Sequence, residues 1–149
     1  MTDADPNLAR EQRKSSALQQ LLGYRLVEWE ADRAVIAYDV KADHLNCTNR
    51  LHGGIIATLC DTAAGYAGVW CDTPCETRST VTLSLTVNFL ASVSGGRVFA
   101  EARRRGGGQK IFFADVEVRD EEARLIATAT GTFRYVSATP VGIRIEPDR

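Results

Sequence analysis

The stretch that decides the fold runs from Asn46 to Trp70 and reads NCTNRLHGGIIATLCDTAAGYAGVW. After His52 and two glycines, sixteen residues are apolar or small except for the carboxylate of Asp61. The larger apolar side chains recur every three or four residues, which predicts an α-helix that is covered on nearly all sides. Because burying a lone carboxylate is unfavourable unless it is paired or used, Asp61 needs a partner or a function.

Asp61 and His52 are the two side chains of this helix that could do chemistry. They are nine residues apart, which separates them by about 13 Å along a helix axis and places them on opposite faces. One helix therefore cannot hold them as a pair. If both serve one site, His52 comes from one copy of the chain and Asp61 from another, which requires at least a two-fold dimer.

The positions of Asn46, of His-Gly-Gly at 52–54 and of Asp-Thr-Ala at 61–63 resemble those of the PaaI-type (phenylacetate-pathway) acyl-CoA thioesterases. The resemblance continues through VTLSLTVNFLA after the helix and covers about residues 20–136. It implies an α+β protein with the hotdog fold, in which a curled antiparallel sheet wraps around a long central helix. Residues 1–149 would then form a single thioesterase domain.

The patterning outside the central helix agrees with this fold. An amphipathic helix is expected over residues 6–22, with Asp5 as its cap and Gly23 as its stop. Alternating or apolar runs bounded by turn residues predict six strands between residues 24 and 136, which form the core with the helix. These strands are expected over 24–30, 33–40, 81–89, 97–105, 110–119 and 124–136. The tail over 137–149 has weak patterning and is expected to be loose.

Composition excludes several other classes of protein. A net charge of −1 gives no reason to expect nucleic acid as a partner. Four glycines and an acidic residue in the apolar stretch argue against a membrane span, and no apolar leader follows Met1, so a cytoplasmic location is expected. The four cysteines lack CxxC spacing and the chain has only two histidines, so no metal site is expected. Cys60 is interpreted as a residue that packs the helix. Cys47 is the more interesting thiol, because it neighbours Asn46.

The resemblance implies a role for five residues. Asp61 would be the general base or the nucleophile, and the backbone N–H of Gly53 would bind the oxyanion of the thioester. Asn46 and His52 match polar residues near the thioester or the attacking water, and Thr82 matches the hydroxyl that helps to place that water. Helix starts carry unpaired N–H groups, so the oxyanion role has a physical basis. The alternatives are a structural Asp61 and glycines needed only for close packing.

One position departs from the family pattern. Asn49 stands where the family usually has glycine, three residues before His52. Asparagine tolerates the left-handed backbone conformation better than most residues, so the turn is expected to survive.

Coenzyme A carries phosphates, so its site should contain positive charge. The triple glycine near residue 107 is flanked by cations, and the family's nucleotide-contacting loops lie in this part of the chain. The candidates are Arg103, Arg104, Gly107 and Lys110, with Arg78 as a weaker one. An ordinary solvated turn would look the same. No cofactor is expected, because coenzyme A is part of the substrate.

The leading hypothesis is therefore an acyl-CoA thioesterase for aromatic or short- to medium-chain acyl groups. It would be a homodimer with shared active sites, and such dimers would pair into a tetramer. One alternative is a hotdog-fold acyl-thioester hydratase or dehydratase, although those enzymes use a different spacing of acid and histidine. A second is a non-catalytic acyl-CoA sensor, for which about twenty residues before the first strand are too few to form a DNA-binding unit.

Overall fold

The computed structural model describes residues 5–72 and 78–136. Its helices and strands are α1 (Pro6–Gln12), α2 (Ala17–Leu22), β1 (Arg25–Glu30), β2 (Arg33–Asp39), a short 3-10 helix (Ala42–His44), α3 (Gly53–Val69), β3 (Ser79–Phe89), β4 (Arg97–Gly107), β5 (Ile111–Asp120) and β6 (Leu125–Val136). The expected strands are all present, with ends shifted by a few residues. The tail expected over 137–149 lies outside the described residues.

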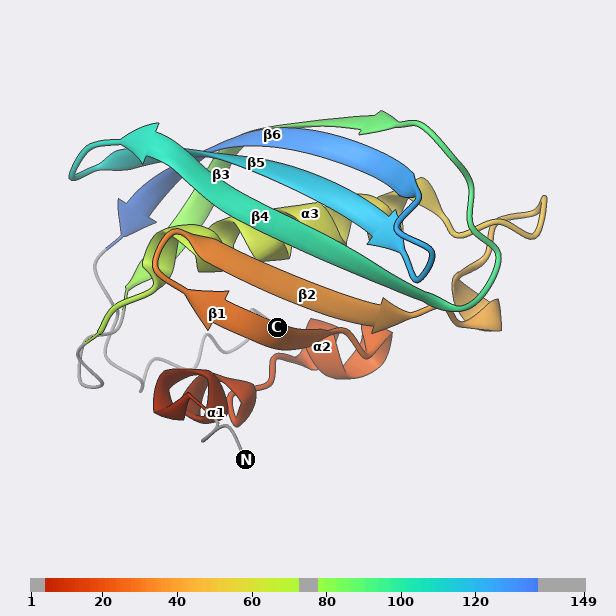
Figure 1. The fold of residues 1–149 in the computed structure, drawn as a ribbon, viewed down its shortest axis with the longest axis horizontal. Coiled ribbons are helices and arrows are strands. Elements are labelled where there is room, and N and C mark those ends of the chain that lie inside the picture. The colour runs from red at the N-terminus through yellow and green to blue at the C-terminus, as the bar shows by residue number, and fades with distance from the viewer. Residues whose placement is uncertain (1–4, 73–77, 137–149) are drawn as a thin grey trace, which may run out of the picture.

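The six strands form one antiparallel sheet in the order β1-β2-β4-β5-β6-β3. The sheet curls around α3, as Figure 1 shows, and α3 contacts every strand. The curled antiparallel sheet around a long helix that the sequence predicts is therefore confirmed. β1 and β3 are the two edges, and β3 pairs only with β6 among the described strands.

Small side chains allow the sheet to close tightly on α3. The helix buries Ala63, Ala64 and Ala67 together with larger apolar residues nearer its start. At Gly68 an added Cβ would lie 2.0 Å from the ring of Phe112, so only glycine fits there. This close approach explains why the helix is rich in alanine and glycine although both weaken hydrophobic patterning.

The helix expected over residues 6–22 is two helices, so that prediction was wrong in its extent. The side chain of Ser16 accepts a hydrogen bond of 3.1 Å from the backbone N–H of Gln19 and starts α2 as a new helix. Before the break, Gln12 donates a hydrogen bond of 2.7 Å from its side chain to the carbonyl of Leu26. α1 is thereby fastened to β1 independently of α2.

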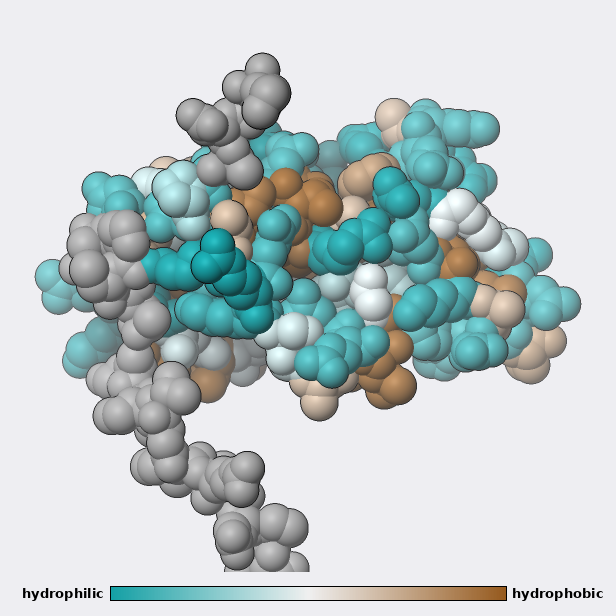
Figure 2. Space-filling model, turned by 90° about the horizontal axis from the view of Figure 1, so that it is seen from below, coloured by the Kyte–Doolittle hydropathy of each residue, from teal (hydrophilic) through white to brown (hydrophobic). Residues whose placement is uncertain are grey.

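The face that carries α1 and α2 is mostly hydrophilic, with separate hydrophobic patches (Figure 2). Leu18 and Leu21 are 50% and 71% exposed, whereas Leu22 is buried. The apolar side of the amphipathic helix expected over residues 6–22 is therefore only partly packed. The N-terminal end behaves as two short helices laid on the outside of the sheet.

Strand β3 contains a bulge that the alternating sequence does not reveal. Its pairing with β6 shifts register between Thr82 and Ser84, so Leu83 is the extra residue. Before the bulge, Thr82 faces α3, and after it Leu85 and Val87 pack on the core. Strict alternation over 81–89 would place the apolar side chains on one face and the hydroxyls on the other, but the bulge exchanges the two faces within the strand.

Candidate active site

Asp61 lies in the middle of α3 and is joined to β3 by a short hydrogen bond. The hydroxyl of Thr82 donates to Asp61 Oδ1 over 2.6 Å. Both residues line a cavity of about 330 Å³, together with Gly65, Thr80 and other residues. Asp61 is half-buried, so its carboxylate is neither sealed in the core nor free in bulk water. The expected neighbourhood of Asp61 and Thr82 is present.

A tyrosine and a second acid also line this cavity. Tyr66 follows Asp61 on α3, and Glu11 reaches the cavity from α1. Burial, with a further contribution from Glu11, raises the pKa of Tyr66 to about 12. The Trp29 indole donates a hydrogen bond of 2.8 Å to the carbonyl of Tyr66 and packs edge-on against its ring. Tyr66 is therefore a fixed and protonated hydrogen-bond donor.

The start of α3 presents the groups expected to bind an oxyanion. His52 caps the helix, because its Nδ1 accepts a hydrogen bond of 2.9 Å from the backbone N–H of Gly54. The N–H of His52 itself donates to the carbonyl of His44 over 3.0 Å. The N–H of Gly53 has no acceptor among residues 5–72 and 78–136. This N–H remains available for a ligand.

Asn46 holds the loop that leads into α3. Its side-chain oxygen accepts hydrogen bonds from the backbone and hydroxyl of Thr48, over 2.9 and 2.7 Å, and from the N–H of Arg50 over 3.2 Å. Within the same loop Asn49 has φ 56°, the left-handed conformation that the sequence led us to expect. Because its oxygen is used in this turn, Asn46 offers any ligand the N–H donors of its amide.

The structure does not bring the expected site residues together within one chain. Asn46, His52 and Gly53 lie at the start of α3 and are absent from the lining of the cavity around Asp61. From Gly53 to Asp61 the helix advances by about 12 Å. A single chain therefore contains two separate candidate half-sites, one with the carboxylate of Asp61 and one with the N–H of Gly53.

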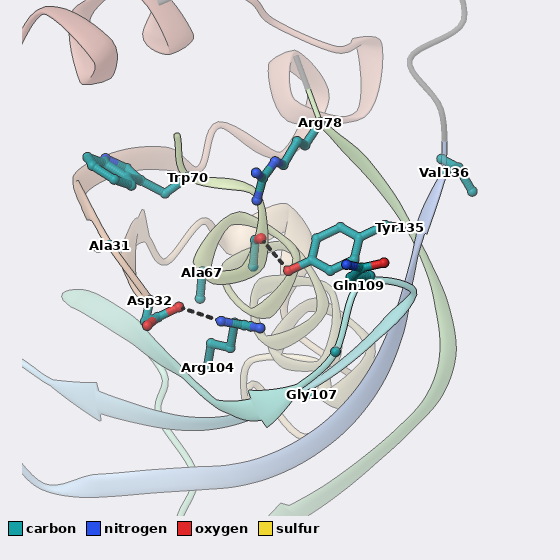
Figure 3. Close-up of a pocket in the computed structure, with 12 residues that line it drawn as sticks. Ala31, Asp32, Ala67, Trp70, Arg78, Arg104, Gly107, Gln109, Tyr135 and Val136 are labelled. Atoms are coloured by element: carbon teal, nitrogen blue, oxygen red, sulfur yellow. Dashed lines mark hydrogen bonds and ion pairs between the residues drawn. The ribbon is translucent and has the colours of Figure 1, made fainter. Parts of the chain in front are cut away.

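The four residues expected to contact coenzyme A lie on different surfaces. Arg104 and Gly107 line a second and larger cavity, of about 660 Å³, together with Arg78 (Figure 3). Arg103 is absent from that lining and forms an ion pair of 2.6 Å with Glu101. Lys110 is exposed and does not line the cavity. The alternation of side chains along β4 separates Arg103 from Arg104, whereas Lys110 lies between β4 and β5.

Cys60 and Cys47 differ strongly in their surroundings. Cys60 is buried, and burial beside Asp61 raises the pKa of its thiol to about 12. It therefore remains a neutral thiol and packs the helix, whereas Cys47 is exposed. Among the described residues, no three His, Cys, Asp or Glu side chains gather in a way that could hold a metal ion. No helix in the described parts of the chain is long and apolar enough to cross a membrane.

Sequence reasoning missed two residues of the Asp61 cavity. Tyr66 is one of the larger side chains that recur along the helix, so it carries no separate signal, although it lies five residues after Asp61. Glu11 carries no local signal, because its position depends on how α1 packs against the sheet. Arg78 was a weak candidate, and the structure places it in the lining of both cavities.

Comparison with known proteins agrees with this geometry. Residues 48–127, more than half of the chain, match the model of the thioesterase superfamily. The acyl-coenzyme A thioesterase PaaI of Escherichia coli is 26% identical over 130 residues, which cover 87% of this chain and 89% of PaaI. The solved structure of the E. coli PaaI protein superposes with a TM-score of 0.76 at 25% identity, over 89% of this chain and 93% of PaaI.

A thioesterase of Haemophilus influenzae, HI1161, superposes with a TM-score of 0.78 at 25% identity, over 87% of this chain and 90% of its own. The fold and these matches define a hotdog-fold thioesterase. This chain belongs to the thioesterase superfamily and is a homologue of PaaI.

Proposed function

We propose that this chain hydrolyses acyl-CoA thioesters, with Asp61 as the base that activates water. The observation that carries the proposal is the hydrogen bond from Thr82 to Asp61 in an open cavity. It uses one oxygen of the carboxylate and leaves the other to accept a proton. A water held between Asp61 and the Thr82 hydroxyl is in position to attack a carbonyl carbon.

In the reaction, the water oxygen bonds to the thioester carbon while its proton passes to Asp61. The carbonyl oxygen becomes an oxyanion, which accepts a hydrogen bond from the backbone N–H of Gly53 in a second copy of the chain. His52 and Asn46 of that copy lie beside it. An N–H donor at such a position contributes about 3 kcal/mol to transition-state stabilisation. Breaking the carbon–sulfur bond releases the thiolate of coenzyme A, which takes a proton, and the free acid. Direct nucleophilic attack by Asp61 is the alternative chemistry.

A homodimer would unite the two half-sites. Strand β3 is eleven residues long, lies at a sheet edge and exposes Val81, Leu83 and Phe89. Long apolar edges of this kind are rarely left open, because they pair readily with another strand. Ile111 and Phe113 are also exposed on β5, which favours pairing of dimers into a tetramer.

The substrate class is proposed from the relatives and from charge. PaaI is named an acyl-coenzyme A thioesterase, and aromatic or short- to medium-chain acyl groups are the first choice here. Arg103, Arg104, Gly107 and Lys110 remain the proposed contacts for coenzyme A. The exposed cations among them suit phosphates that stay partly in water. A cytoplasmic location also remains a proposal.

The test is release of thiol from phenylacetyl-, hydroxybenzoyl- and aliphatic acyl-CoA by the native chain and by Asp61→Asn. Loss of the general base should lower turnover at least about a hundredfold. Circular dichroism should show that the variant is still folded. Native turnover that survives in Asp61→Asn would remove Asp61 from the mechanism. Hydration of an enoyl-CoA without thiol release would favour a hydratase, and tight binding without turnover would favour a sensor.

A further inference from the structure

The larger cavity lies at the C-terminal end of α3, beyond the Asp61 cavity. Figure 3 shows it with α3 viewed end-on and with the side chains of Arg78 and Arg104 pointing toward its open middle. Its volume of about 660 Å³ is twice that of the Asp61 cavity, about 330 Å³. Because Arg78 lines both cavities, the two are neighbours.

Positive charge in this cavity is only partly neutralised. Arg104 forms an ion pair of 3.1 Å with Asp32, through one of its terminal nitrogens. Its Nε is buried and has no hydrogen-bond partner within the described part of the chain. Arg78 pairs with no carboxylate among residues 5–72 and 78–136. Two guanidinium groups and one carboxylate leave one unbalanced positive charge.

The fold fixes Arg104 in this place. Asp32 sits in the β1–β2 turn with φ 60°, and its carbonyl accepts a hydrogen bond of 2.9 Å from the backbone N–H of Arg104. The turn therefore holds both the backbone and the side chain of Arg104. At the opposite wall, the hydroxyl of Tyr135 donates to the carbonyl of Gly68 over 2.8 Å and closes the end of α3. The guanidinium groups are thus not needed to cap that carbonyl.

The two cavities lie beside the same helix, α3. From Asp61 to Gly68 the helix makes about two turns and advances about 10 Å. Both residues therefore lie on nearly the same side of α3, one beside each cavity. A substrate whose thioester lies at Asp61 can carry a charged group as far as the larger cavity.

We propose that Arg78 and Arg104 form a site for an anionic group of the substrate, in the cavity that neighbours the Asp61 cavity. The group is a carboxylate at the far end of the acyl chain or a phosphate of coenzyme A, and both accept the paired N–H donors of arginine. This inference rests on the proposed thioesterase function. It adds a preference for charged substrates that the family membership does not state.

The experiment compares four substrates. Adipyl and hexanoyl groups have the same carbon number, but only adipyl ends in a carboxylate, and each is prepared as the thioester of coenzyme A and of N-acetylcysteamine. KM and kcat are measured for the native chain, Arg78→Gln and Arg104→Gln. Arg105→Gln is the matched control, because Arg105 pairs with Asp115 over 2.8 Å and does not line the cavity.

A loss of one charge-assisted contact should raise KM about tenfold for the substrates that use it. If the acyl carboxylate is bound, only the adipyl substrates lose affinity, on both carriers. If a phosphate of coenzyme A is bound, both CoA substrates lose affinity and neither N-acetylcysteamine substrate does. Either outcome supports the site and identifies the group. Changes of less than about threefold in all four substrates would overturn the proposal.

Asp32→Asn separates an anion site from a structural role of the arginines. Asparagine tolerates the left-handed turn and can still accept from Arg104, while the cavity gains one positive charge. KM for the charged substrates should therefore fall, and KM for hexanoyl N-acetylcysteamine should not change. An unchanged or higher KM for every charged substrate would contradict the proposal, even if the arginine variants fold poorly.

Failure of the proposed function remains distinguishable from failure of this site. If the native chain releases no thiol from any substrate, thioester hydrolysis is wrong. Binding of adipyl-CoA and hexanoyl N-acetylcysteamine is then measured by calorimetry on the native chain and Arg104→Gln. Weaker binding of adipyl-CoA alone would support the anion site, and equal binding by both proteins would overturn it.

Discussion

Thr82 donates a hydrogen bond of 2.6 Å to the carboxylate of Asp61, although Thr82 belongs to β3 and Asp61 to the middle of α3. The bond depends on the bulge at Leu83, which allows Thr82 to face α3 in a strand whose later apolar residues face it too. One carboxylate oxygen is thereby fixed in direction. The orientation of the proposed base is consequently a property of β3 as well as of α3.

Replacing Thr82 tests this orientation. Thr82→Val keeps the shape and removes the hydroxyl, so a hydrogen bond to a charged group worth about 1.5–3 kcal/mol is lost. Turnover should fall about tenfold to a hundredfold, since RT ln 10 is about 1.4 kcal/mol. Thr82→Ser should retain most activity because it keeps a hydroxyl. Thr86→Val on the same strand is the control, and an equal loss there would point to damage of the strand rather than of the site.

Subunit mixing tests whether the site is shared. Asp61→Asn and His52→Ala should each lose activity as homodimers. In mixed dimers, one site receives both native residues and the other receives both substitutions. Random exchange of equal amounts should recover about a quarter of native turnover, because half of the dimers are mixed and half of their sites are intact.

The control for this experiment is a mixture of Asp61→Asn with Asp61→Ala, which cannot rebuild a site. Sedimentation velocity at micromolar concentration should show a dimer or a larger assembly in every sample. A monomer, or absence of recovery after exchange has been verified with labelled subunits, would contradict the shared site.

Tyr66 should titrate late. Its pKa of about 12, against an ordinary value of 10.0, means that between these values the folded chain keeps a proton that the unfolded chain has lost. Tyr66 therefore contributes stability that is fully present below about pH 10 and is lost as the pH rises through 12. Phenolate absorbance of native and Tyr66→Phe protein should differ by one late-titrating group. Glu11→Gln should lower the pKa of Tyr66 only in part, because burial remains the larger cause.

Two glycines of α3 should respond oppositely to alanine. At Gly68 the new Cβ meets Phe112 at 2.0 Å, so Gly68→Ala should destabilise the fold by about 1–3 kcal/mol. At Gly65 the nearest atom is the Thr80 hydroxyl oxygen at 3.5 Å, and Gly65→Ala should leave stability unchanged or raise it by up to about 1 kcal/mol. Urea unfolding at one protein concentration measures both. Equal effects at the two positions would contradict the packing described here.

The architecture could be predicted from the sequence because its patterns are strong. The apolar run around Asp61 and the alternating strands predict the central helix and the sheet. The helix end predicted at Gly23 is confirmed, because Gly23 has the left-handed conformation with φ 83°. The left-handed Asn49 was also predictable, because few other residues accept that conformation. These features depend on local chemistry, which a sequence states directly.

Features that depend on packing between distant elements could not be predicted. The bulge at Leu83 leaves the alternation of letters intact, and the break before Ser16 interrupts a pattern that is still amphipathic. Glu11 enters the Asp61 cavity only because Gln12 ties α1 to β1. Arg103 and Arg104 are adjacent residues of equal charge, and only the geometry of the strand places them on different surfaces.

The bulge at Leu83 also affects how this strand should be compared and engineered. A position-by-position alignment with an unbulged strand would equate the residues on either side of Leu83 wrongly, so it needs a gap there. In space, Thr82 and Leu85 belong to the same row, although their numbers differ by an odd count. A library that varies residues before Leu83 would change the pocket, while one that varies residues after it would change the core. One strand thus offers two regions that can be redesigned separately.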